Sequence, residues 1–271
     1  MTSDHSARAL LFRRLHEEDL LLLANAWDAG SARLMESLGA RAVATTSAAV
    51  AWSHGYADGN FLPVPRLVAA VADMVRAIRV PLSVDMEGGY SDEAAVVGEN
   101  IARVLGEGAV GINLEDGTGA PDLLCAKIGQ ARRAGDRLGV QLFVNARTDV
   151  YVRNLVPVER RLEETLARAE RYRAAGADGI FVLGLTEPAA IRTIAASVRL
   201  PLNVLARADL PAATELAALG VRRLSAGSAI AEVMYGRMAA LAADFLRTGI
   251  SAPLLADAMP YREINALMAA R

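Results

Sequence analysis

The sequence predicts an α/β protein, a (β/α)8 TIM barrel of parallel strands with additional C-terminal helices. Eight short apolar runs recur along the chain, and each is followed by polar or glycine residues and then by a helical pattern. The runs are continuously apolar, which indicates strands that are buried on both faces and paired in parallel. Glycine stands before several of them, as in Gly108-Ala109 and Gly176-Ala177, where a helix is expected to end.

The predicted strands leave room for one helix after each of them. In chain order they are LLLANA (21–26), RAVATT (41–46), PLSVDM (81–86), VGINLED (110–116), QLFVNAR (141–147), GIFVLG (179–184), PLNVLA (201–206) and RRLSAG (222–227). Because no linker or change of composition divides the chain, residues 1–271 are expected to form one domain.

Two helical segments follow the last strand, roughly 228–247 and 253–269, and GISAP separates them. The second segment lies beyond a completed barrel. It is therefore expected either to cap the barrel or to pack on a neighbouring subunit, and the pattern leaves both open.

Composition excludes several classes of function. A net charge of −2 and a pI near 6.0 give no basic surface for nucleic acid or an anionic membrane. No apolar run approaches the roughly 18 residues of a membrane span, and the N-terminal residues lack the apolar core of a signal peptide. One cysteine, Cys125, and three histidines make a disulfide or a His-rich zinc site unexpected. A cytoplasmic protein is expected.

Carboxylates gather where the predicted strands end, the edge of a parallel barrel that carries the active site. Asp85 and Glu87 end the third strand and Glu115 ends the fourth. Carboxylates this close repel one another unless a cation lies between them, and oxygen ligands without His or Cys favour Mg²⁺ or Mn²⁺. A metal site at these three residues is predicted. The alternative is that one caps a helix and another pairs with Arg147.

Arg147 ends the fifth strand and is suited to bind a substrate carboxylate through two hydrogen bonds. The alternative is a structural ion pair with Glu115 or Asp149. After the second strand, the small residues Ser47 and Ala48 predict a turn whose backbone N–H groups can bind a carboxylate or phosphate oxygen.

The segment WSHGYADGNFLP (52–63) is expected to be an irregular loop over the site. Asp58 is its only carboxylate, either a general acid or base or a plain turn residue. Lys127, the only lysine, and Cys125 stand in a predicted helix, which makes a nucleophilic role for either unexpected.

Six stretches agree in order and spacing with one known superfamily. They are NAWDAGSARL (25–34), the Ser47-Ala48-Ala49 turn, GYADG with Asp58, VDMEGGY with Asp85 and Glu87, INLEDG with Glu115 and Asp116, and NARTD with Arg147. Over nearly the whole barrel the chain thus resembles the isocitrate lyase and phosphoenolpyruvate mutase superfamily.

The resemblance implies which residues form the active site and what they bind. It places Mg²⁺ on Asp85, with Glu87 and Glu115 mostly holding the waters of the ion. It also implies a 2-oxo carboxylate bound to the metal, with its carboxylate end held by the backbone of 47–48 and by Arg147. Asn203 matches a substrate-binding position of the lyase members.

The resemblance further implies a homo-oligomer, a dimer of dimers in which a C-terminal helix is exchanged between subunits. Residues 253–269 are expected to be that helix.

Two departures narrow the expected activity. The lyase members carry a Lys-Cys-Gly-His type motif after the fourth strand, whereas GTGAPDLLCAKIG follows Glu115-Asp116 here, in a connection shorter by roughly a dozen residues. Leu183 stands where the lyases have Glu and the mutase has His.

The sequence therefore predicts a Mg²⁺-dependent carbon–carbon lyase that acts on a small 2-oxo or 2-hydroxy acid through an enolate. Decarboxylation or hydrolysis of an oxaloacetate-like acid is the nearest variant, because it does not need the missing cysteine acid. The alternatives are a C–P bond enzyme of the phosphonopyruvate hydrolase or mutase type, and a non-catalytic protein that binds Mg²⁺ and a keto acid.

Overall fold

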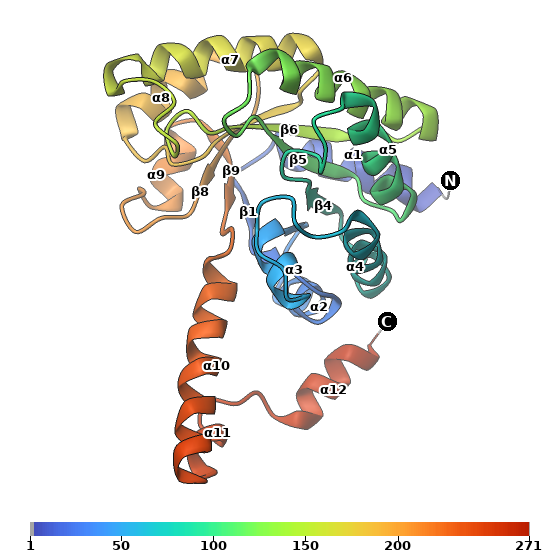
Figure 1. The fold of residues 1–271 in the computed structure, drawn as a ribbon, viewed down its shortest axis with the longest axis vertical. Helices are drawn as coiled ribbons and strands as arrows, with labels where there is room; N and C mark the ends of the chain where they lie inside the picture. The colour runs from blue at the N-terminus through green and yellow to red at the C-terminus, as the bar shows by residue number, and fades with distance from the viewer. Residues whose placement is uncertain (1–2, 271) are drawn as a thin grey trace.

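A closed barrel of parallel strands, as predicted, forms the centre of the computed structural model, which describes residues 3–270 (Figure 1). β1 (Leu21–Leu23) and β2 (Asn25–Ala26) are two parts of one strand that is interrupted at Ala24. β1 pairs with β9 and β2 pairs with β3, so the sheet closes on itself. The other strands are β3 (Val43–Thr45), β4 (Leu82–Asp85), β5 (Gly111–Glu115), β6 (Phe143–Thr148), β7 (Gly179–Val182), β8 (Leu202–Leu205) and β9 (Val221–Ser225).

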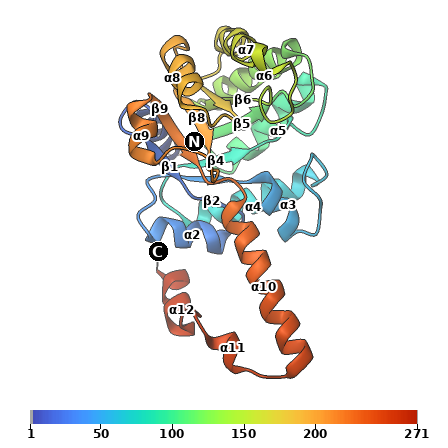
Figure 2. The same cartoon turned by 90° about the vertical axis from the view of Figure 1, so that its left-hand side faces the viewer.

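Helices follow the strands and form the outer layer (Figure 2). Their apolar faces pack on the barrel; Leu67, Val71 and Met74 of one helix, for example, are fully buried. In chain order these helices are α2 (Ala29–Ser37), α3 (Ser47–Ser53), α4 (Val64–Ala77), α5 (Ala94–Gly106), α6 (Pro121–Leu138), α7 (Arg161–Ala175), α8 (Pro188–Ser197) and α9 (Ala213–Ala218).

An N-terminal helix, α1 (Ser3–Leu15), packs against the end of the barrel where the strands begin. The Phe12 ring lies edge-on to Phe143, the first residue of β6, with 5.5 Å between the ring centroids. A Cβ atom on Gly111 would lie 2.5 Å from the Phe12 ring, so only glycine fits at the start of β5. The sequence patterns did not indicate this helix.

Burial of His16 beside α1 predicts that acid destabilises the protein. Its ring stacks on Phe143 with 4.0 Å between centroids, and burial, together with nearby Arg223, lowers its pKa from 6.5 to about 3. Between these values the unfolded chain binds a proton and the folded one does not. The free energy of unfolding should therefore fall as the pH decreases from 6.5 to 3, by up to about 1.4 kcal/mol per pH unit.

Urea denaturation of His16→Phe at several pH values checks this dependence. The variant should lose most of it, and His54→Gln, at an exposed histidine, should keep the wild-type slope. The same slope in His16→Phe as in the wild type would contradict the assignment.

The C-terminal segments differ in part from the prediction. The first is a single helix, α10 (Ala229–Thr248), as expected. Residues 253–269 do not form one helix: α11 (Ala252–Leu255) is short, the chain turns, and α12 (Tyr261–Ala269) begins after Pro260. Proline fixes the backbone at a helix start and cannot donate the hydrogen bond that a continuous helix needs there.

α10 leaves the barrel and extends away from it, and α12 returns toward α2 (Figures 1 and 2). The Arg33 Nε–H donates to the Leu267 carbonyl oxygen at 3.1 Å, which ties α12 to α2. None of the described helices has the length and apolarity that crossing a bilayer requires.

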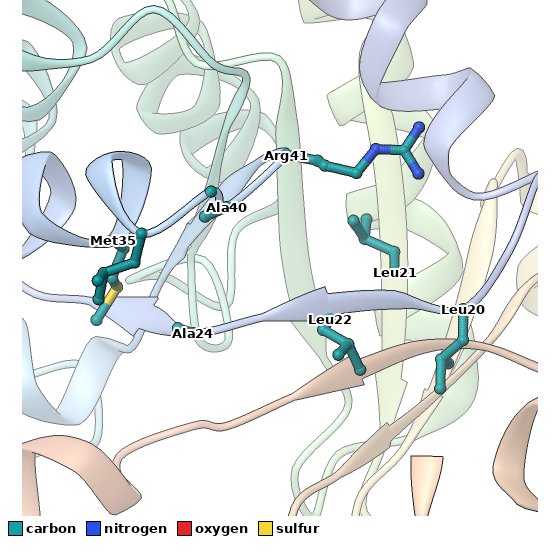
Figure 3. Close-up of a pocket in the computed structure, with 9 residues that line it drawn as sticks. Leu20, Leu21, Leu22, Ala24, Met35, Ala40 and Arg41 are labelled. Carbon is teal, nitrogen blue, oxygen red and sulfur yellow. The ribbon is translucent and has the colours of Figure 1, made fainter. Parts of the chain in front are cut away.

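The departure of α10 leaves the outside of β1 uncovered. A cavity of about 390 Å³ lies there, lined largely by apolar side chains that include Leu20, Leu22, Met35 and Leu38 (Figure 3). Leu22 is 56% exposed and Leu38 is 78% exposed. In a (β/α)8 barrel the helix after the last strand normally covers this position, so the cavity marks a missing helix and not the active site.

Candidate active site at the barrel mouth

Asp85 is the last residue of β4 and lies at the mouth of the barrel. Its backbone N–H donates to Thr45 Oγ1 at 2.8 Å, which fixes the strand end against β3. One carboxylate oxygen accepts the Ser47 N–H at 3.2 Å, and the other accepts the Glu87 N–H at 3.4 Å. The structure thus places Asp85 against the first turn of α3.

Ser47 and Ala48 are the first two residues of α3, where the sequence predicted a turn. The first N–H groups of a helix have no acceptor within the helix. Because the Ser47 N–H donates to Asp85, the remaining N–H groups of this turn are the ones available to a bound ligand.

Glu87 lies in the turn after β4, with a left-handed backbone at φ 50°. Its Oε2 accepts the Asn60 N–H from the loop that also carries Asp58. Its Oε1 is buried and has no hydrogen-bond partner among residues 3–270. Burial raises the pKa of this carboxyl group, and Asp58 and Asp85 add to the shift.

Glu115, Arg147 and Asp149 form a chain of ion pairs across β5 and β6. Arg147 Nη1 lies 2.6 Å from Glu115 Oε2, while its Nε and Nη2 donate to the two oxygens of Asp149 at 2.7 and 3.0 Å. Burial raises the pKa of Glu115 to about 7 despite the opposing effect of Arg147. Both ion pairs that the sequence left open as alternatives are therefore present, and Glu115 lies beside the guanidinium that is expected to bind substrate.

Asp58 lies on the exposed loop between α3 and α4, close to Ser47 and Asp85. Partial burial is the largest cause of its raised pKa, and the negative charge of Asp85 is the next, while a hydrogen bond from the Ser47 side chain opposes the shift. The loop thus brings a fourth carboxyl group to the mouth of the barrel.

These carboxylates fit Mg²⁺ better than a metal that needs a closed set of protein ligands. No three His, Cys, Asp or Glu side chains within the described part of the chain form a ready-made metal site. Mg²⁺ usually takes one or two carboxylates and keeps several waters. Asp85 as the direct ligand, with the unpartnered Glu87 Oε1 able to accept from a bound water, matches that requirement.

The barrel interior below these residues contains a buried arginine that the sequence analysis did not predict. Arg223 of β9 is fully buried, and its side chain reaches Ser225 and Asn113 inside the barrel. Asn203, predicted to bind substrate, is also fully buried and accepts from Ser225. The sequence of this strand contains two adjacent arginines, Arg222 and Arg223, and does not show which of them points inward.

Asp116, next to Glu115, faces the helices and not the mouth. It accepts from Thr148 Oγ1, the Asp149 N–H, Arg168 Nη1 and the Tyr172 hydroxyl at 2.6 to 2.9 Å. It therefore fixes the segment whose Asp149 side chain holds Arg147.

Replacing Asp116 with alanine is expected to lower the free energy of unfolding by about 3–5 kcal/mol, because it leaves the buried donors of Thr148, Asp149 and Tyr172 without their acceptor. It also removes one of the two carboxylates that pair with Arg168, the other being Glu164. Urea denaturation measures the loss. Asp122→Ala removes an exposed carboxylate that pairs with Arg171 and should stay within about 1 kcal/mol of the wild type. Equal effects of the two substitutions would refute the structural role.

The two helical residues with nucleophilic side chains differ in their distance from the site. Lys127 Nζ donates to the Gly88 carbonyl oxygen at 2.6 Å and so supports the turn that carries Glu87. The Cys125 thiol faces the Arg171 carbonyl oxygen on the outer helix layer.

Comparison with known proteins identifies the family of this chain. The model of the phosphoenolpyruvate phosphomutase family matches residues 12–246. Oxaloacetate decarboxylase of Paraburkholderia xenovorans (strain LB400) is 29% identical over 251 residues, which cover 84% of this chain and 81% of that protein.

Solved structures give the same result. A "putative phosphonomutase" of Burkholderia cenocepacia J2315 is 44% identical, with a TM-score of 0.82, and the match covers 87% of this chain and 98% of that chain. 2,3-Dimethylmalate lyase, a member of the PEP mutase/isocitrate lyase superfamily, shares the fold with a TM-score of 0.84 at 24% identity, over 96% of this chain and 94% of that chain. The match along nearly the whole barrel shows that this chain belongs to the phosphoenolpyruvate phosphomutase family.

Proposed function

We propose that this protein is a Mg²⁺-dependent carbon–carbon lyase that acts on a small 2-oxo or 2-hydroxy acid. Decarboxylation or hydrolysis of an oxaloacetate-like acid is the favoured reaction. The observation that carries the proposal is the cluster of Asp58, Asp85 and Glu115 around one guanidinium, Arg147, at the strand ends. Glu87 lies beside Asp58 and Asp85 in the same cluster. The decarboxylase relative supports the choice of substrate class.

The metal is assigned to Asp85 as direct ligand, with Glu87 and Glu115 holding its waters. Mn²⁺ has the same ligand preferences and is the expected substitute. When bound, the ion supplies a positive charge that stabilises the negative charge developing on the 2-oxo oxygen of the substrate.

The protein groups bind and orient the acid. The substrate carboxylate is assigned to Arg147 and to the free N–H groups at the start of α3, next to Ser47 and Ala48. In decarboxylation, the electrons of the bond between carbon 3 and carbon 4 stay on the 2-oxo end as an enolate, and CO₂ leaves. Asp58, whose pKa is raised by burial and by Asp85, is then placed to return a proton to carbon 3.

A second candidate reaction is the cleavage or rearrangement of a C–P bond. The 44% identity to the "putative phosphonomutase" favours it, and Asp58 is in place for it. It differs from the first candidate in its product, since phosphate or a shifted ³¹P signal would appear from phosphonopyruvate.

Thermal unfolding with Mg²⁺ and a panel of acids tests the proposal. The panel contains pyruvate, oxaloacetate, 2-oxoglutarate, isocitrate, methylisocitrate and phosphonopyruvate. An acid at 100 times its dissociation constant adds about 2.7 kcal/mol to the free energy of unfolding, and chelation of the metal should remove that gain. Turnover of each binding acid is then followed; binding without turnover would favour the non-catalytic alternative, and no binding would overturn the proposal.

We also propose that the chain forms a homo-oligomer in which the C-terminal helices of one copy cover the barrel of another. α10 exposes a row of apolar side chains at helical spacing: Met234, Met238, Leu241 and Phe245. The uncovered cavity beside β1 is the matching apolar surface on the barrel. A second copy of this chain supplies both surfaces, as a symmetric oligomer requires.

A further inference from the structure

A row of hydrogen bonds crosses the interior of the barrel beneath Asp85. It begins at Asn145 of β6, whose Nδ2–H donates to Asn113 Oδ1 at 2.9 Å. Arg223 of β9 donates through Nη2 to the same oxygen at 3.3 Å and through Nε to Ser225 Oγ at 3.2 Å. Ser225 Oγ lies 3.2 Å from Asn203 Oδ1 on β8. All five side chains are buried.

The guanidinium group of Arg223 determines which atoms donate and which accept in these hydrogen bonds. A guanidinium group has donors and no acceptor, so the Ser225 oxygen must accept from Arg223. The serine hydroxyl proton is then free to donate to Asn203 Oδ1. With its carbonyl oxygen engaged in this way, Asn203 presents its Nδ2–H₂ group on the opposite side.

Two buried donors remain unused. Asn203 Nδ2 and Arg223 Nη1 have no hydrogen-bond partner among the residues that the structure describes. A buried polar group without a partner costs about 1–3 kcal/mol, and more when it is charged. Because both free groups are donors, the partner that would satisfy them is an acceptor oxygen.

The charge of Arg223 favours an anion as that partner. Burial lowers its pKa to about 10, so the guanidinium stays charged at neutral pH, and Asp85 is the carboxylate that opposes this shift. Arg223 has no ion pair with any of residues 3–270. A cation inside the barrel, below the mouth, attracts an acid group that enters from above.

We propose that Arg223 is a positioning residue for substrate binding. Acting through Ser225, it holds the Asn203 amide so that Nδ2 donates to an oxygen of the bound acid. This inference rests on the proposed function, because it takes the mouth of the barrel as the site of a small carboxylic acid. It adds a residue pair, Arg223 and Ser225, that acts on substrate without belonging to the carboxylate cluster.

The test uses oxalate, a small diacid with no bond to cleave in this reaction, and measures its dissociation constant by thermal unfolding with saturating Mg²⁺. Ser225→Ala frees the Asn203 amide to turn and should weaken oxalate binding about tenfold. The dissociation constant for Mg²⁺ alone should not change. Ser225→Thr keeps the hydroxyl and should restore oxalate binding.

Ser83→Ala is the matched control, because Ser83 is another buried serine of the barrel interior. It lies close to Gly111, at the end of the barrel where the strands begin. It should bind oxalate as the wild type does. Arg223→Met, examined only if its circular dichroism matches the wild type, should weaken oxalate binding at least as much as Ser225→Ala.

The outcomes separate this inference from the proposed function. If the wild type binds oxalate and Ser225→Ala binds it equally well, the positioning role is wrong and the proposed function stands. A loss of Mg²⁺ affinity in Ser225→Ala equal to its loss of oxalate affinity would also overturn the role, since it would indicate general damage to the site. A wild type that does not bind oxalate at all would overturn both.

Discussion

Asp85→Ala should lose oxaloacetate turnover by on the order of 10⁴-fold or more, down to the background of free Mg²⁺. Asp85 is the carboxylate at the centre of the cluster: it accepts from the first turn of α3, and its charge influences the pKa values of Asp58, Glu87 and Glu115. Without it, the cluster lacks the carboxylate to which the ion is assigned as direct ligand. The Mg²⁺-dependent rise in melting temperature should disappear together with turnover.

Asp85→Asn removes the charge of the side chain but keeps its shape. The amide keeps an oxygen for the Ser47 N–H but lacks the charge, so it should lose Mg²⁺ binding nearly as fully as the alanine variant. Asp92→Ala is the matched control, because Asp92 lies on the same connection with a side chain that is 99% exposed. Wild-type Mg²⁺ affinity in Asp85→Asn, or equal losses in all three variants, would refute the assignment of the metal to Asp85.

The barrel could be predicted because buried parallel strands have a recognisable sequence pattern. The strands are buried on both faces, so most of their residues are apolar, and the carboxylates come where the strands end. Arg223 and the asparagines that face the barrel interior are the exceptions. Asp85, Glu115 and Arg147 were found in this way, and the structure places all three at the same end of the barrel. The short break at Ala24 divides the first strand without changing its place in the sheet.

The features that were missed depend on contacts distant in sequence. Arg223 stands beside Arg222 in the strand, and only the register of β8 with β9 shows that one of the two points into the barrel. α1 is stabilised by the contact of Phe12 with Gly111, residues about a hundred positions apart, which no local pattern records. Pro260, by contrast, was a local signal that residues 253–269 would not form one helix.

Charges on the exposed row of α10 should dissociate the oligomer. The row of Met234, Met238, Leu241 and Phe245 repeats at intervals of four and three residues, which is the spacing of a helix face that packs on another surface. Burying a Met or Phe side chain stabilises an interface by about 1.5–3 kcal/mol, and a carboxylate in the same place must lose its hydration. Met238→Asp with Phe245→Asp should therefore reduce the mass in solution, measured by light scattering, to that of one 28.6 kDa chain.

The opposite face of the same helix supplies the control. Arg247→Glu also changes the charge of α10, at an exposed residue that lies about half a turn away from the row, and it should leave the mass unchanged. Leu22→Asp, in the cavity beside β1, should dissociate the oligomer as the α10 variant does, because the proposed contact joins these two surfaces. If Leu22→Asp keeps the wild-type mass while the α10 variant loses it, the helices pack on each other rather than on the barrel. A wild type that is already monomeric would refute the exchange altogether, and the apolar row would then require another partner.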